Sequence, residues 1–183
     1  TDYVFDGYKK GKYTESDITC PLSVYGKSKA EGDKVLLSLV SRVIILRTSW
    51  VFGEHGNNFV KTMIRLGKER ESLGVIFDQI GTPTYARDLA SAVFAAIRKG
   101  IIPGIYHFSN EGVCSWYDFT KSIHRIASIG NCKVSPLHTD EYPAKAPRPH
   151  YSVLDKTKIK HTYGIEIPHW EESLEQCIKE LNV

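Results

Sequence analysis

The chain has 183 residues, of which 42% are hydrophobic, so it can bury a substantial core in one domain or one and a half. Its 24 Lys and Arg against 21 Asp and Glu leave a net charge of +3. The excess is spread along the chain, which indicates no nucleic-acid partner. No apolar run approaches the roughly 20 residues that cross a bilayer, and we expect no membrane partner.

The cysteines and histidines also limit the function. Four cysteines without close pairs indicate reduced thiols in a cytoplasmic protein. Seven histidines show no metal-ligand spacing, so we expect no protein-ligated catalytic metal.

The first predicted element is the end of a buried strand. It covers Thr1 to Phe5 and closes at the Asp6-Gly7 turn. A helix is predicted after Pro21, with Ser23 as its N-cap. Its buried face is expected to consist of Val35, Leu36, Leu39 and Val40. The β-branched run from Val43 to Leu46 is typical of a buried parallel strand.

The middle of the chain predicts two further helices around a short strand. Asn57 or Asn58 can cap a helix that runs to about Arg70, and a strand is expected over 74–77. Thr84 can cap the next helix, which Gly100 ends. Its apolar positions follow helical spacing and comprise Leu89, Ala92, Val93, Ala96 and Ile97.

The last third continues the alternation of strands and helices. Strands are expected over 105–108 and 134–137, separated by a helix that Ser115 and Asp118 start in the manner of a capping box. Two short helices finish the chain. The pattern predicts an α/β fold with a largely parallel sheet.

A dinucleotide-binding glycine motif is absent from the 183 residues. Neither G-x-G-x-x-G nor G-x-x-G-x-x-G occurs. The chain starts with Thr at the end of a predicted strand, so we expect a fragment whose pyrophosphate loop precedes Thr1.

Tyr25 and Lys29 are the first candidates for chemistry. Four residues apart on a helix, they project to the same side. An ammonium beside a phenol favours the phenolate, so the pair suits proton exchange with a carbonyl or alcohol. A hydroxyl such as that of Thr1 could hold the same oxygen. Taken alone, the pattern also fits a solvated helix face.

Several segments carry a family resemblance across nearly the whole chain. They include Thr1 to Gly7, Pro21 to Lys29, Arg47 to Gly53 and Gly56 to Phe59. Asp78 to Thr84, Asp88 to Ala90 and Arg148-Pro149 with Ser152 and Leu154 continue the match. Together they resemble the extended short-chain dehydrogenase/reductases, and most closely the dTDP-4-dehydrorhamnose reductase (RmlD-like) family.

The resemblance implies an NAD(P)H-dependent oxidoreductase that acts on the 4-keto group of dTDP-4-dehydro-6-deoxy-L-mannose. Tyr25 would be the general acid, and Lys29 would bind the nicotinamide ribose of NADPH or NADH. Thr1 would hydrogen-bond the keto oxygen, and Asp2 would accept a hydrogen bond from the sugar or the keto-side network. The Arg148 side chain is a looser candidate for a phosphate contact.

Trp50 and two asparagines complete the predicted site. Trp50 follows a buried strand and could simply pack in the core, but the resemblance makes it a substrate contact. Asn57 or Asn58 caps the next helix, and the other residue could help the helix N-terminus to hold the diphosphate.

The resemblance also implies how the chain is divided. Residues 1–53 and 76–112 would form the carboxyl-terminal part of a Rossmann-type dinucleotide-binding domain with its catalytic helix. Residues 54–75 and 113–183 would form a smaller α/β sugar-nucleotide-binding domain. We expect a dTDP-sugar substrate, a homodimer as candidate assembly, and no turnover by the fragment alone.

Two alternative functions stay open at this point. One is a reductase of a stereoisomeric nucleotide sugar. The other is a non-catalytic dinucleotide-binding regulatory subunit, like the beta subunit of methionine adenosyltransferase. The segment from Arg47 to Gly53 fits the reductases better than the regulatory subunit.

Overall fold

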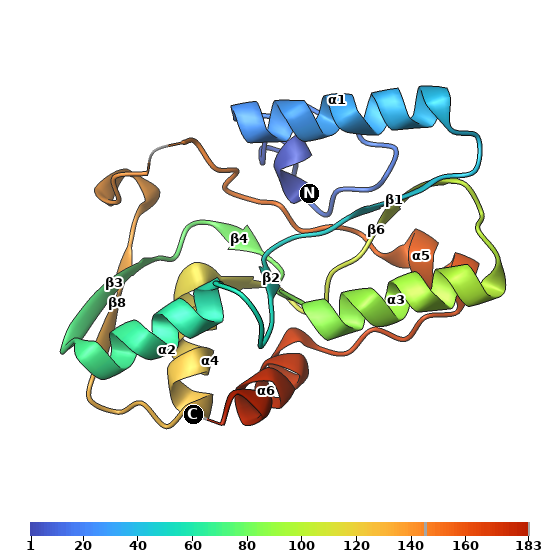
Figure 1. The fold of residues 1–183 in the computed structure, drawn as a ribbon. Helices are drawn as coiled ribbons and strands as arrows, with labels where there is room; N and C mark the ends of the chain where they lie inside the picture. The colour runs from blue at the N-terminus through green and yellow to red at the C-terminus, as the bar shows by residue number, and fades with distance from the viewer. Residues whose placement is uncertain (145, 183) are drawn as a thin grey trace.

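The computed structural model describes residues 1–144 and 146–182, which form helices around short pairs of strands (Figure 1). In this part of the chain the α-helices are α1 (Val24–Leu39), α2 (Phe59–Glu69), α3 (Ala86–Lys99), α4 (Trp116–Ile126), α5 (Thr157–Tyr163) and α6 (Trp170–Leu181). Two short 3-10 helices are η1 (Asp2–Val4) and η2 (Thr139–Glu141). The strands are β1 (Ile44–Arg47), β2 (Val51–Phe52), β3 (Ser72–Ile76), β4 (Ile80–Gly81), β5 (Thr84–Tyr85), β6 (Gly104–His107), β7 (Cys114–Ser115) and β8 (Lys133–Leu137).

Parallel pairing dominates, as the sequence predicts. β1 pairs with β6, β2 with β5 and β3 with β8, all in parallel, whereas β4 and β7 are antiparallel. The described strands pair two by two instead of forming one continuous sheet. The mixed α/β class is therefore confirmed.

The start of the chain differs from the prediction of a strand end. Residues Asp2–Val4 form the 3-10 helix η1. The Thr1 hydroxyl accepts a hydrogen bond from the Tyr3 amide, and the Phe5 amide donates to the Asp2 carbonyl. These local bonds close a tight turn, and the Asp2 amide still reaches the Thr48 carbonyl after β1 at 3.0 Å.

Helix α1 begins as predicted but buries much less than expected. Ser23 is the N-cap, and its hydroxyl accepts from the Gly26 amide at 3.1 Å. The expected buried face is wrong, because Val35, Leu36, Leu39 and Val40 are all exposed. Only Gly26 and Ala30 are buried, since the first turns alone pack on η1 while the rest of α1 extends across the top of Figure 1.

The start of α3 is also corrected. Thr84 lies in β5 opposite Val51, and Tyr85 takes the N-cap position without a side-chain hydrogen bond. Of the expected apolar stripe, Ala92 and Ala96 are buried, whereas Val93 and Ile97 are exposed.

Two other predicted caps are confirmed. Asn58 caps α2, and Ser115 with Asp118 forms a capping box at the start of α4. These caps satisfy amide groups that the first helical turn leaves without partners.

The buried apolar residues form three clusters. The largest joins α2, α4, α6 and the β3–β8 pair, and includes Phe52, Val60, Phe119, Ile123 and Leu174. The second packs α3 and α5 against β6 through Tyr106, Phe108 and Ile159. The third holds the start of the chain on Leu154. Within the described residues, no helix is long and apolar enough to cross a membrane.

Candidate functional site

A cleft of about 490 Å³ lies between η1, the start of α1 and the loop after β1. It brings together five of the seven predicted site residues, namely Thr1, Asp2, Tyr25, Lys29 and Trp50. Thr1 and Trp50, which are 49 positions apart in the sequence, therefore line the same cleft.

Tyr25 and Lys29 lie one turn apart on α1, as their spacing predicts. The Lys29 Nζ is 5.7 Å from the centroid of the Tyr25 ring, and Tyr3 meets that ring edge to face at 6.1 Å. The Tyr25 side chain is about half exposed. In the described part of the chain Lys29 forms no ion pair, so its ammonium is free to bind hydroxyl groups in the cleft.

Gly26 is a residue that the sequence reasoning missed. A Cβ atom at this position would overlap the Tyr3 carbonyl oxygen and would lie 2.9 Å from the Pro21 Cβ. Because glycine has no Cβ, the backbone of α1 can lie directly against η1. This contact places the helix that bears Tyr25 beside Thr1 and Asp2.

Thr1 and Asp2 are linked to each other. The Thr1 hydroxyl donates to the Asp2 Oδ1 at 3.1 Å while it accepts from the Tyr3 amide. Asp2 is only 2% exposed, so it meets the cleft mainly through Thr1. Burial raises the pKa of Asp2 from 3.8 to about 6, because desolvation disfavours the carboxylate.

An ion pair beneath the cleft was also missed. Arg47 at the end of β1 donates from Nε to the Asp33 Oδ2 at 2.9 Å. The Arg47 side chain is 5% exposed, and Asp33 lines the cleft one turn beyond Lys29. The pair ties α1 to β1. Asp33 lies eight positions after Tyr25, a spacing with no motif of its own.

Trp50 lines the cleft and also contacts the core. Its ring stacks on Trp116, with centroids 3.6 Å apart and planes at 12°. It packs against the largest apolar cluster while remaining half-buried. The two interpretations from the sequence, core packing and substrate contact, are compatible for this side chain.

Asn57 and Asn58 do not reach this cleft. They line a separate cavity of about 190 Å³ beside Glu54. Both polar atoms of the Asn58 amide have partners, since Oδ1 accepts from the Lys61 amide and Nδ2 donates to the Gly53 carbonyl. The Glu54 carboxylate lies here, paired with Arg87 at 3.0 Å, and makes this cavity a poorer place for a diphosphate.

A third cavity lies on the other side of Tyr25. It measures about 420 Å³ and is lined by Tyr3, Tyr25, Pro147 and Arg148, among others. Tyr25 therefore lines two cavities, one with Lys29 and the other with Arg148.

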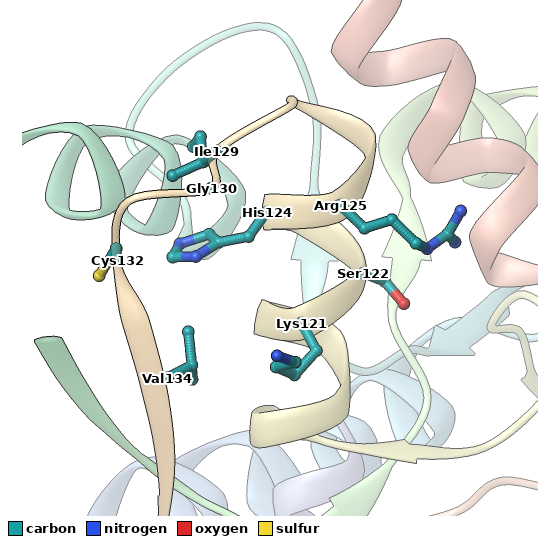
Figure 2. Close-up of a pocket in the computed structure, with 8 residues that line it drawn as sticks. All are labelled: Lys121, Ser122, His124, Arg125, Ile129, Gly130, Cys132 and Val134. Atoms are coloured by element: carbon teal, nitrogen blue, oxygen red, sulfur yellow. The ribbon is translucent and has the colours of Figure 1, made fainter.

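Figure 2 shows a cavity of about 430 Å³ between α4 and β8, away from all predicted site residues. Its Ser122 and Arg125 side chains turn away and contact Glu171 at 2.6 and 3.1 Å. Across the described ranges, no group of three or more His, Cys, Asp or Glu could hold a metal ion.

Comparison with known families gives a match over the whole chain. The RmlD substrate binding domain matches residues 1–183. The chain belongs to the RmlD substrate-binding family.

Relatives of this RmlD-family chain include a named reductase and a polysaccharide biosynthesis protein. It is 52% identical over 184 residues to the dTDP-4-dehydrorhamnose reductase of Aggregatibacter actinomycetemcomitans, covering 95% of the chain and 63% of that protein. It is 43% identical to the spore coat polysaccharide biosynthesis protein SpsK of Bacillus subtilis, covering 98% of the chain and 62% of that protein. The chain thus spans less than two thirds of the length of these relatives.

Solved structures agree with the family. A dTDP-4-dehydrorhamnose reductase from Clostridium acetobutylicum matches with a TM-score of 0.95 and 45% identity, over 100% of the chain and 64% of that structure. One from Bacillus anthracis, in complex with NADP, matches with a TM-score of 0.93 and 43% identity, over 98% of the chain and 63% of that structure. The resemblance read from the sequence is confirmed.

We expect Gly26→Ala in this RmlD-family chain to disrupt the cleft. The new methyl group would overlap the Tyr3 carbonyl, so α1 and η1 must separate. Urea denaturation should show a loss of at least about 1 kcal/mol. Gly32→Ala is the matched control, because nothing lies within 4 Å of a Cβ there and alanine favours the same helix. Equal stability of the two variants would contradict the close contact.

The raised pKa of Asp2 should make the stability of the protein depend on pH. Its folded pKa of about 6 exceeds the ordinary 3.8, so between these values the folded state binds the proton more tightly. The free energy of unfolding should lose roughly 3 kcal/mol from this group as pH rises from about 4 to about 6. The opposite contribution of buried His107, whose pKa burial lowers to about 4, is common to wild type and variant. Denaturant titrations of Asp2→Asn against wild type should therefore show the Asp2 contribution as a difference; identical pH profiles would refute it.

Proposed function

We propose that the protein containing this chain is an NAD(P)H-dependent oxidoreductase. It would reduce the 4-keto group of dTDP-4-dehydro-6-deoxy-L-mannose to give dTDP-L-rhamnose. The observation that carries this proposal is the convergence of Tyr25, Lys29 and Thr1 on one cleft. The names of the relatives support the substrate.

Tyr25 is the proposed proton donor to the keto oxygen. Its half-exposed side chain lines the cleft, which is the position a general acid needs. The Thr1 hydroxyl has a single proton, which it donates to Asp2 in the structure. For Thr1 to bind the keto oxygen, this hydroxyl rotates away from Asp2. Thr1 thus aligns the carbonyl, and Tyr25 supplies the proton.

Lys29 suits the contact to a cofactor ribose. Its ammonium lies in the cleft without an acidic partner among the described residues, so its three donors are available for hydroxyl groups. The bound nicotinamide supplies the hydride. The NADP in the Bacillus anthracis relative supports NADPH, and NADH remains the alternative.

Each of the remaining predicted residues is assigned to a different part of the substrate. Trp50 would contact the deoxysugar from the wall of the cleft. Asp2 would act on the sugar through Thr1, because its own carboxyl group is buried. Arg148 lines the cavity of about 420 Å³ next to Tyr25, and its guanidinium would bind the diphosphate. Asn57 and Asn58 remain weaker candidates for this anion, because Glu54 lies in their cavity.

A reductase of a stereoisomeric sugar is the second candidate. A relative from Streptomyces niveus is named dTDP-4-keto-6-deoxy-D-glucose reductase and is 36% identical over 183 residues, covering 63% of that protein. The acid–base residues would be the same for both sugars. Comparing turnover of the two 4-keto sugars would separate the candidates.

We also propose the division into two parts that the sequence predicts. The largest cluster, centred on α2, α4 and α6, supports a substrate-binding part over 54–75 and 113–183. Helix α5 packs with α3 and β6, so within that part it adjoins the dinucleotide-binding side, 1–53 and 76–112. Homodimer formation and a cytoplasmic location stay predictions, as does inactivity of the 183-residue chain alone.

Tyr25→Phe tests the proposed acid. In the protein that contains this chain, the variant should lose at least 100-fold in kcat for reduction of the dTDP-4-keto sugar, because no phenol proton is left to transfer. Affinity for the sugar nucleotide, measured by calorimetry, should stay within a few-fold. Absorbance of NADPH follows turnover directly.

Tyr8→Phe is the matched control, since Tyr8 is 75% exposed and away from the cleft. It should retain wild-type turnover. If Tyr25→Phe turned over at close to the wild-type rate, Tyr25 would not be the acid.

A further inference from the structure

We propose that Trp116 is a positioning residue for substrate binding: it fixes the indole of Trp50 in the wall of the cleft. This inference rests on the proposed function, because it assigns the sugar to that cleft. Trp116 is the first residue of α4 and does not itself line the cleft. It acts on the sugar only through Trp50.

The backbone of Trp50 is strained. Its φ is 47°, in the left-handed region that bulky residues rarely adopt. Such a conformation persists only where the surroundings hold it. One support is a backbone hydrogen bond, in which the Thr84 amide donates to the Trp50 carbonyl at 3.2 Å. The side chain needs a support of its own.

The stack on Trp116 supplies this support. The two rings are nearly parallel, with centroids 3.6 Å apart. From behind, Phe59 of α2 packs on Trp116 with centroids 4.6 Å apart. The capping box of Ser115 and Asp118 fixes the first turn of α4, and with it the start of the Trp116 side chain.

Gly81 provides the room for this arrangement. A Cβ on Gly81 would lie 2.7 Å from two carbons of the Trp50 ring. Gly81 belongs to β4, which pairs with β7 so that Gly81 lies opposite Cys114. Residues Cys114 and Ser115 lead directly into Trp116. One short strand pair therefore places both the glycine and the stacking partner around Trp50.

The stack decides which part of Trp50 a sugar can meet. Trp116 covers one face of the indole, so only the remainder is open to the cleft. With a smaller side chain at position 116, the Trp50 ring could turn into the space left by the lost indole. A sugar would then lose its apolar wall, although Tyr25 and Lys29 would stay in place.

The test combines spectroscopy with kinetics on the protein that contains this chain. Two stacked indoles give a coupled circular dichroism signal in the far ultraviolet, which Trp116→Leu should abolish. The same variant should raise KM for the dTDP-4-keto sugar about tenfold, with kcat within about threefold of wild type. Trp116→Phe keeps an aromatic face and should restore most of the affinity.

Trp170→Phe is the matched control for the loss of a tryptophan. Trp170 is buried on α6 beside Phe119 and does not line the cleft. It should keep both the coupled signal and the wild-type KM. Thermal unfolding of each variant shows whether a raised KM reflects a loss of folding.

Several results of this test would overturn the proposal. A wild-type protein without the coupled signal overturns the stack, and a Trp116→Leu variant that loses the signal but keeps the wild-type KM overturns the positioning role. Equal falls in kcat for Trp116→Leu and Trp116→Phe would also overturn it. A wild-type protein that neither binds nor reduces the sugar nucleotide would instead refute the proposed function.

Discussion

The candidate site depends on the close approach of α1 to η1 at Gly26. Tyr25 and Lys29 share a helix, so their mutual position follows from helical geometry alone. Thr1 and Asp2 come from the start of the chain, and the tight backbone contact at Gly26 brings α1 to them. Ser23 supports the contact by capping the helix at its first turn, where the approach occurs. Position 26, next to Tyr25, therefore requires a glycine.

The charged side chains around the cleft differ in whether they have partners. Asp2 is buried and accepts from Thr1, while Asp33 lines the cleft and pairs with Arg47. A buried arginine without its partner would be costly, which ties the position of Asp33 to the strand β1. Lys29 lines the same cleft and has no ion-pair partner among the described residues, so its ammonium is available to a ligand. In the part of the chain that the structure describes, the Lys29 ammonium is therefore available where a ribose is proposed to bind.

The sequence predicts features that depend on neighbours along the chain. The caps at Ser23, Asn58 and Ser115 follow from short spacings, and so do the parallel strands around β1 and β6. It fails where the outcome depends on what packs from elsewhere. The apolar side of α1 has helical spacing, yet Val35 and Leu39 are exposed in the described chain. Thr84 has the side chain of a cap but pairs as a strand instead.

The same distinction applies to the site. The motif from Tyr25 to Lys29 and its relation to Thr1, Asp2 and Trp50 could be read from the resemblance, and the structure places these residues together. The partners that hold them could not be read. Arg47 lies 14 positions after Asp33, and Trp116 lies 66 positions after Trp50, so no local pattern links either pair. Asn57 and Asn58 follow a helix-cap pattern that the sequence cannot separate from an anion site, and the structure uses Asn58 as the cap.

The hydrogen bond from Thr1 to Asp2 separates the roles of the two hydroxyl groups in the cleft. Above about pH 6 Asp2 is ionised and accepts the Thr1 proton strongly. The Thr1 hydroxyl thus donates to an acidic acceptor, whereas the Tyr25 hydroxyl has no such acceptor among the described residues. This difference supports the proposal that Tyr25, and not Thr1, is the proton donor. In the proposed reaction the Thr1 hydroxyl turns from Asp2 to the keto oxygen and orients it by a hydrogen bond, without giving up its proton.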